Sequence, residues 1–192
     1  MFRDLVLKTR TYRRFYERSP VSMETLKDLT GTARLTASAG NLQPLCYILS
    51  SNPETNEVVF RHLRWAAYLK DWDGPREGER PAAYIIMLGD TSRGKDFAWD
   101  QGIAAQTIML AAAEIGLGGC MMGSVDKQGL RRDLDIPDRY EILLILAIGR
   151  PKEMVVLEQL EETKDIRYYR DSQGHLHVPK RRLGDVILKK FR

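Results

Sequence analysis

The sequence predicts an α+β fold in which helices pack on a mixed central β-sheet, and three observations carry this prediction. The segments 82–88 and 142–148 are almost continuously apolar and end at glycine, which is typical of strands buried within a sheet. Residues 100–115 are rich in alanine and other small residues, which indicates a long helix that packs closely against another helix. The chain has 192 residues, of which 43% are hydrophobic and 29% charged, so one globular domain with a substantial core is expected.

The elements before residue 80 follow from local signals. A short helix is predicted at 2–6, and a second helix begins after Ser22, whose hydroxyl suits an N-cap. A strand is expected at 45–50. Residues 56–70 predict a helix because apolar side chains recur there at helical spacing, and a polar loop that contains Gly and Pro follows at 71–80.

The elements after the long helix are shorter. Glycines at 116–119 end that helix, and 120–123 continues as a short extended piece. Another short helix is expected near 126–133, before the central strand. The C-terminal part then adds a hairpin with arms 166–170 and 175–178, and a last helix that carries Leu183, Val186, Ile187 and Leu188.

Composition argues against several classes of protein. No apolar run reaches the roughly 18 residues of a membrane-spanning helix, the N-terminus lacks a signal peptide, and two cysteines are too few for a disulfide framework. A cytoplasmic protein without a membrane partner is therefore expected. The net charge is +4, but the basic residues are spread along the chain and no nucleic-acid-binding motif accompanies them. We expect no nucleic-acid partner, and the basic groups at 10–14 and 180–182 suit a small phosphate better.

The sequence carries none of the usual catalytic or metal-binding motifs. The glycines at 116–119 follow a helix and lack the third glycine of a dinucleotide-binding loop. His175 and His177 have no clear third ligand, so no metal site is predicted. The apolar neighbours of Cys120 are expected to raise its pKa and leave an inert thiol. We therefore expect no catalytic side chain, and an enzyme built on this chain would rely on a bound cofactor for its reactivity.

The stretch 37–44, ASAGNLQP, combines small residues with two side-chain amides directly before an apolar segment. Small residues allow a backbone to approach a flat ligand, and Asn41 and Gln43 can donate and accept hydrogen bonds at once, as a heteroaromatic edge requires. An ordinary loop before a strand explains the stretch equally well when it is taken alone.

Four segments, in this order, resemble the nitroreductase-like family of FMN-dependent oxidoreductases. Residues 10–15, RTYRRF, match the family's R-S-x-R-x-F pattern with Thr in place of Ser, and 38–44 match S-x-x-N-x-Q-P. Residues 100–123 match a long Ala-rich helix that ends in G-L-G-x-C-x-x-G, and 146–151 match a strand that ends in G-x-P. The resemblance implies the nitroreductase-like fold and a homodimer with interlocked subunits.

The resemblance also implies which residues hold FMN. Arg10 and Thr11 would lie near its ribityl-phosphate, with Tyr12 in the same segment, and Arg13 would lie near the pyrimidine edge, where a cation stabilises the reduced ring. A second basic arm would bind the phosphate. The remaining members of the cofactor site would be Lys180 and Arg181 in that arm; Met121, Met122, Gly123 and Ser124 along the face and N5 edge of the ring; and Ser38, Ala39, Gly40, Asn41 and Gln43 from the partner subunit.

Some positions keep alternatives open. Leu45 stands where the family often has Trp, and the stretch before Lys180 is longer than in the shortest family members, so Arg182 or Arg150 are alternative phosphate ligands. Plain core packing also explains the two methionines. A mobile cover is expected around 65–80, which contains three large aromatic residues, and helix packing plus a loose loop explains that segment equally well.

The activity that the resemblance implies is hydride transfer from NADH or NADPH through FMN to a small acceptor by a ping-pong mechanism. The acceptor would be a nitroaromatic, a quinone or an activated alkene. Residues 1–192 would form a single domain in which 165–192 is a C-terminal hairpin and extension that contributes to the cofactor site. The alternatives are a flavin-binding sensor or carrier without turnover, and a specialised relative that removes halide or cleaves the flavin.

Overall fold

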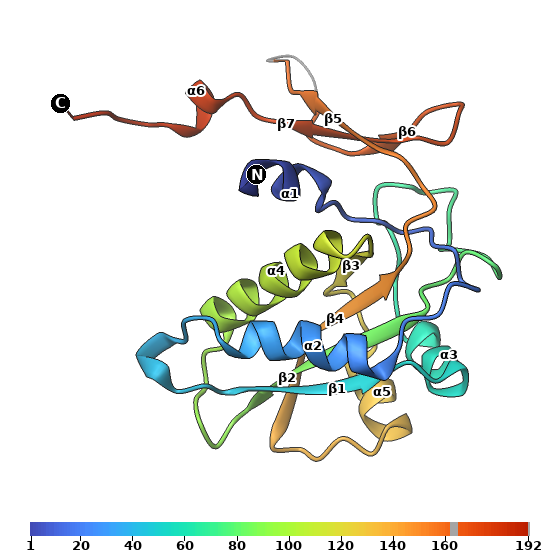
Figure 1. The fold of residues 1–192 in the computed structure, drawn as a ribbon, viewed down its shortest axis with the longest axis vertical. Coiled ribbons are helices and arrows are strands. Elements are labelled where there is room, and N and C mark those ends of the chain that lie inside the picture. The colour runs from blue at the N-terminus through green and yellow to red at the C-terminus, as the bar shows by residue number, and fades with distance from the viewer. Residues whose placement is uncertain (162–164, 192) are drawn as a thin grey trace.

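Two apolar strands, β2 and β4, form the centre of a four-stranded sheet in the computed structural model, which describes residues 1–161 and 165–191 (Figure 1). The strand order is β1-β2-β4-β3, and these neighbours pair antiparallel. Parallel pairing enters at the β3 edge, through a bridge between Thr11 and Gly119. The strands are β1 (Leu45–Ser50), β2 (Ala83–Asp90), β3 (Gly118–Met122) and β4 (Tyr140–Gly149). Every residue of β2 is buried, as its apolar sequence predicts.

Helices cover both faces of this sheet, which confirms the predicted fold class (Figure 1). Ile85 and Met87 of β2 share one core cluster with α2 and α4, whereas Tyr84 and Ile86 face the other way and share a second cluster with α3 and α5. The elements are α1 (Phe2–Lys8), α2 (Met23–Arg34), the 3₁₀ turn η1 (Ala39–Asn41), α3 (Pro53–Arg61), α4 (Ala98–Glu114) and α5 (Lys127–Asp133). Within the described ranges, no helix combines the length and the apolar character that crossing a bilayer would require.

The helix predicted at 56–70 is wrong in its second half. Helix α3 begins at Pro53, behind an N-cap in which the Asn52 side chain accepts a hydrogen bond from the backbone N–H of Thr55, and it ends at Arg61. Beyond this end, Leu63 forms a β-bridge with Val125 on a distant segment. That long-range pairing overrides the local helical spacing. The Ser22 N-cap, by contrast, is confirmed, since its hydroxyl accepts from the backbone N–H of Thr25.

The C-terminal part forms a second, three-stranded sheet in the order β5-β7-β6. Strands β6 (Tyr169–Arg170) and β7 (Leu176–Lys180) are the predicted hairpin, which is confirmed, and β5 (Val155–Gln159) was not predicted and pairs parallel to β7. The predicted last helix is shorter than expected, because α6 is a single turn at Leu183–Val186. The chain beyond it is extended and points away from the body of the molecule (Figure 1). Arg192 lies outside the described residues.

His177 connects the three strands of this small sheet. Its Nδ1 lies 2.6 Å from Glu158 Oε1 on β5, its Nε2 lies 3.0 Å from Asp171 Oδ2, and its ring stacks on Tyr169 of β6. The carboxylate of Asp171 and then that of Glu158 raise the pKa of His177 above its ordinary value of 6.5. A protonated ring donates to both carboxylates, so this contribution to stability is complete below pH 6.5 and is lost as the pH rises through the raised pKa.

An NMR titration of the His177 ring is therefore expected to show a midpoint above pH 6.5 in the folded protein. Asp171→Asn removes the charge of the larger contributor to the raised pKa and should move the midpoint downward. His175 also faces Asp171, with Nδ1 and Oδ2 3.4 Å apart, so its ring signals need a separate assignment. A wild-type midpoint at or below 6.5 would contradict the ion-paired arrangement.

Candidate cofactor site

The N-terminal basic segment lies along the free edge of β3. The backbone N–H of Tyr12 donates to the carbonyl of Gly119 at 2.9 Å, next to the Thr11–Gly119 bridge. A Cβ at Gly118 would lie only 2.5 Å from Cδ2 of the Tyr12 ring, so this close approach requires glycine. The pairing places Arg10 and Thr11 beside the first residues of β3.

A cavity of about 240 Å³ opens at this edge, and four of the predicted cofactor residues border it: Arg10, Thr11, Met121 and Lys180. They come from the N-terminal segment, β3 and β7, which are distant in the sequence. The rest of the wall is Thr9, Gln106, Met109, Gly119, Val155 and Val178, from the same elements and from α4 and β5. The C-terminal sheet therefore closes one side of the cavity.

The charge of this cavity is positive. Arg10 donates from Nη2 to the carbonyl of Val6 at 2.6 Å, while its Nε is buried and has no hydrogen-bond partner among the described residues. Lys180 and the Thr11 hydroxyl supply further donors on the same wall. A buried guanidinium donor without a partner, next to a second cation and a hydroxyl, has the chemistry that binds a phosphate. These residues thus fit the phosphate end of FMN.

Arg13 lies outside this cavity wall. Its side chain is buried, and its guanidinium carbon is 4.4 Å from the centre of the Tyr168 ring, a cation–π contact with the segment that leads into β6. Its backbone N–H donates to Oε1 of Glu153, and the N–H of Arg14 donates to the same oxygen at 3.2 Å. The Glu153 side chain is only 1% exposed and also pairs with Arg170 at 2.8 Å.

A second buried carboxylate, Glu79, fixes the neighbouring Arg14. Arg14 donates to it from Nε and Nη2, both at 2.8 Å, and Lys152 pairs with it at 3.0 Å. The hydrogen bonds from Arg14, with Lys152 adding to them, lower the pKa of Glu79 to about 2. Glu79 and Glu153 together hold the basic segment from two sides.

The predicted residues at the end of β3 differ in exposure. Met121 is exposed and borders the cavity, whereas the Met122 side chain is buried in the second core cluster, so only its backbone is available to a ligand. Gly123 and Ser124 are exposed at the strand end. Burial raises the pKa of Cys120 to about 11, as its apolar neighbours predict, which leaves an unreactive thiol at neutral pH.

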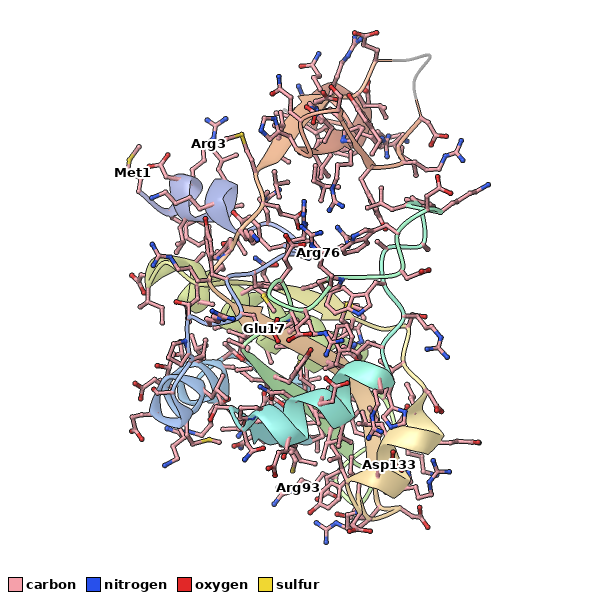
Figure 2. All side chains as sticks on the ribbon, turned by 90° about the vertical axis from the view of Figure 1, so that its right-hand side faces the viewer. Met1, Arg3, Glu17, Arg76, Arg93 and Asp133 are labelled. Atoms are coloured by element: carbon pink, nitrogen blue, oxygen red, sulfur yellow. The ribbon has the colours of Figure 1, made fainter. Side chains whose placement is uncertain are left out.

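The amide-rich loop does not border this cavity in the same chain. Ser38 and Gln43 line a different cavity, of about 270 Å³, between α2, α4 and β1. Arg93 also borders that second cavity and lies at the end of the molecule away from the C-terminal sheet (Figure 2). The predicted members Ala39, Gly40 and Asn41 form η1 within this loop. One chain therefore brings the basic and methionine segments together, but not the amide loop.

The other basic candidates lie elsewhere. Arg181 donates from Nη2 to the carbonyl of Asp185, which folds it back on α6. The Arg150 guanidinium stands over the ring of Tyr16, with 5.8 Å between its carbon and the ring centre. Arg182 is the N-cap residue of α6. Of these C-terminal and strand-end cations, Lys180 is the one that borders the cavity.

The segment expected as a cover is anchored to the protein at several points. Trp65 is only 9% exposed and belongs to the second core cluster, with the Trp72 ring 6.3 Å away at a steep angle. Tyr68 is half exposed and lies 5.0 Å from Tyr168, measured between ring centres. Core packing is therefore the role of Trp65, and Tyr68 is the aromatic residue of this segment that reaches the surface.

Three buried carboxylates organise the candidate site, and sequence reasoning missed all of them. Glu79 and Glu153 hold the basic segment, and Asp100 holds the amide loop. Glu153 follows the strand that ends in G-x-P by only a few residues, yet its partner lies 140 positions earlier, so no local pattern reveals the pairing. Asp100 offered a weak signal, since an acidic residue in the first turn of a helix is favoured by the helix dipole.

Comparisons with known proteins find relatives of similar sequence and similar fold. MhqN of Bacillus subtilis, provisionally named an NAD(P)H nitroreductase, is 26% identical, and the match covers 79% of this chain and 89% of that protein. A Rhodospirillum rubrum protein named 5,6-dimethylbenzimidazole synthase is 24% identical, with 82% of this chain and 86% of that protein covered. The crystal structure of a nitroreductase family protein from Streptococcus pneumoniae shares the fold, with a TM-score of 0.67 and 16% identity over 99% of this chain and 100% of that chain. A profile described as the nitroreductase family matches residues 6–150, and the chain belongs to this family.

Proposed function

We propose that this protein is an oxidoreductase that binds FMN and transfers hydride from NADH or NADPH to a small acceptor such as a nitroaromatic, a quinone or an activated alkene. The observation that carries the proposal is the cationic cavity at the β3 edge, with Arg10, Thr11 and Lys180 on its wall and a buried Arg10 Nε that lacks a partner among the described residues. Family membership and the name of the Bacillus subtilis relative support the same chemistry.

In this proposal the side chains bind and orient, and bound FMN supplies the capacity to accept and donate hydride. Arg10 and Lys180 neutralise the phosphate, and the Thr11 hydroxyl donates to it. Met121 offers an exposed, polarizable surface for a flat ring, and its neighbours in the backbone provide N–H donors at the ring edge. Arg13 is proposed as the cation near the pyrimidine edge of the flavin. To reach that edge, its guanidinium group would have to leave the ring of Tyr168, which it contacts in this structure.

We also propose that the working form is a homodimer in which the amide loop of one subunit completes the cavity of the other. The cavity of about 240 Å³ in one chain is smaller than most pockets that enclose a cofactor. The amide loop does not border this cavity within the same chain and lines a different one. Trp99 and Ile103 stand one turn apart on the exposed side of α4, with Trp99 73% exposed, which supports a contact with a second copy.

The proposal is tested by titrating purified protein with FMN and then adding NADH or NADPH without oxygen. We expect flavin absorbance on the protein and rapid bleaching by at least one nucleotide. Arg10→Ala should weaken FMN binding by about 10- to 100-fold, because a charge-assisted contact to the phosphate is lost. Arg3→Ala is the matched control, since Arg3 is an exposed residue of α1 that does not border the cavity (Figure 2).

Two results would contradict the proposal in different ways. Protein that binds no FMN under any condition would exclude the flavin site. If the protein binds FMN but neither NADH nor NADPH reduces the bound flavin, the result would favour the sensor or carrier alternative. The synthase name of the Rhodospirillum rubrum relative keeps a specialised activity as a second candidate. Turnover with a nitroaromatic acceptor at constant FMN concentration would exclude a reaction that consumes the flavin.

A further inference from the structure

The loop at 38–43 has an unusual backbone. Gly40, Asn41 and Gln43 have positive φ angles of 56°, 54° and 49°. Residues other than glycine rarely adopt this left-handed region, and such a conformation persists only where the surroundings hold it. The Gln43 Nε2 donates to the Asn41 side-chain oxygen at 3.2 Å, so the two amides also support one another. Other parts of the protein must therefore hold the loop in this shape.

Asp100 is the group that holds it. This residue is only 5% exposed and lies in the first turn of the 17-residue helix α4. Its Oδ2 accepts the Ser38 hydroxyl at 2.8 Å, and its Oδ1 accepts the backbone N–H of Ala39 at 2.8 Å. The Ser38 Oγ in turn accepts the backbone N–H of Gln43 at 2.9 Å. One carboxylate therefore fixes the start of the loop directly and its end through Ser38.

The same bonds define what Ser38 offers to a ligand. A hydroxyl has a single proton, and that of Ser38 is donated to Asp100. Its oxygen already accepts from Gln43. Ser38 thus has no proton left to donate to a ligand, whereas Asn41 and Gln43 are exposed and carry amide groups that can both donate and accept. Asp100 has no cationic partner within the part of the chain that the structure describes, and the α4 dipole favours its negative charge.

We propose that Asp100 is a positioning residue that acts through Ser38 and Ala39 to preorganise the Asn41 and Gln43 amides for the cofactor. The proposal rests on the function proposed above, which makes FMN the ligand of the loop. The hydrogen bonds from Ser38, Ala39 and Gln43 that hold the loop lie within one chain. Asp100→Asn keeps the shape of the side chain but turns an NH₂ donor toward one of the two partners. The Ala39 N–H can only donate, and the Ser38 hydroxyl would have to withdraw the proton that it donates to Asp100.

The first test needs no cofactor. Hydrogen exchange of the apo protein, read at the Ala39 and Gln43 amides, should be faster in Asp100→Asn by about tenfold or more, while β2 amides exchange as in wild type. Asp96→Asn is the matched control, because Asp96 is an exposed carboxylate just before α4 that makes no contact with the loop among the described contacts. Unchanged exchange at Ala39 and Gln43, or faster exchange throughout the protein, would overturn the proposal.

The second test reads the cofactor. Asp100→Asn and Ser38→Ala should each raise the FMN dissociation constant by about tenfold, and together they should cost little more than either alone, because both break one chain of bonds. Ser38→Thr keeps the hydroxyl that Ser38→Ala removes, so its FMN affinity should be close to that of wild type. A loosened loop with unchanged FMN affinity in Asp100→Asn would overturn the positioning role. Wild-type protein that binds no FMN would instead overturn the proposed function, and the exchange test would still decide whether Asp100 holds the loop.

Discussion

Glu79→Gln is expected to lower the free energy of unfolding by about 2 to 3 kcal/mol at pH 7. The Glu79 side chain is 4% exposed, and Arg14 and Lys152 converge on it from the N-terminal segment and from the residues after β4. The Arg14 hydrogen bonds are the main reason that the pKa of Glu79 falls from 4.5 to about 2. The amide keeps the size of the side chain but leaves both cations without their counter-charge.

The loss should depend on pH in a defined direction. Because the folded pKa lies below the unfolded one, the carboxylate stabilises the folded state fully above about pH 4.5 and loses this effect as the pH falls toward 2. Urea unfolding should therefore show the largest gap between wild type and Glu79→Gln at neutral pH, and the gap should close near pH 2. Glu77→Gln, an exposed neighbour in the same loop, should stay within about 0.5 kcal/mol of wild type. A gap that is constant with pH would mean that Glu79 acts through its shape and not its charge.

The parts of the fold that the sequence predicted are those with a strong local pattern. The apolar runs of β2 and β4, the N-cap at Ser22 and the turn between β6 and β7 each lie within one short segment. The resemblance to the nitroreductase-like family singled out Arg10, Thr11, Met121 and Lys180, and the structure brings these four residues, from three different elements, to one cavity. Their roles toward a cofactor remain predictions.

The parts that the sequence did not predict depend on contacts between distant segments. Strand β5 is half-buried and pairs in parallel with a strand that begins some twenty positions later. Parallel strands are not joined by a hairpin turn, so the sequence carries no turn signal that would predict this pair. The end of α3 is set by the pairing of Leu63 with Val125. Glu79 is 65 positions from Arg14, and a lone glutamate in a polar loop is indistinguishable from a solvated one until the chain is folded.

The two sets of predicted site residues could be recognised in the sequence, but their positions relative to one another could not be predicted. The motif segments can be identified one by one, because each has its own residue pattern. Their distances are set by tertiary packing, which places the amide loop at a different cavity from Arg10. In the proposed homodimer the second copy of the chain would supply the amide loop, so the oligomeric state is the measurement that tests this shape of the site.

Gly119→Ala is expected to cost about 3 kcal/mol of unfolding free energy, because the position has no room for a side chain. A Cβ there would lie 2.5 Å from the carbonyl oxygen of Ala147 on β4 and 2.9 Å from the Met109 sulfur on α4. The first neighbour is backbone in a central strand, and it cannot move without disturbing the β3–β4 pairing. The strand carrying residue 119 would have to shift instead.

That shift should also reach the cofactor cavity, because the Gly119 carbonyl accepts the Tyr12 N–H that aligns Arg10 and Thr11. Gly31→Ala in α2 is the matched control, since nothing lies within 4 Å of a Cβ there, and it should gain about 0.5 to 1 kcal/mol from helix propensity. Urea unfolding of the two variants separates steric conflict from the general effect of replacing glycine. Equal stabilities for Gly119→Ala and wild type would show that β3 can move away from β4, and the basic segment would then not be held by the rigid strand edge on which the cavity depends.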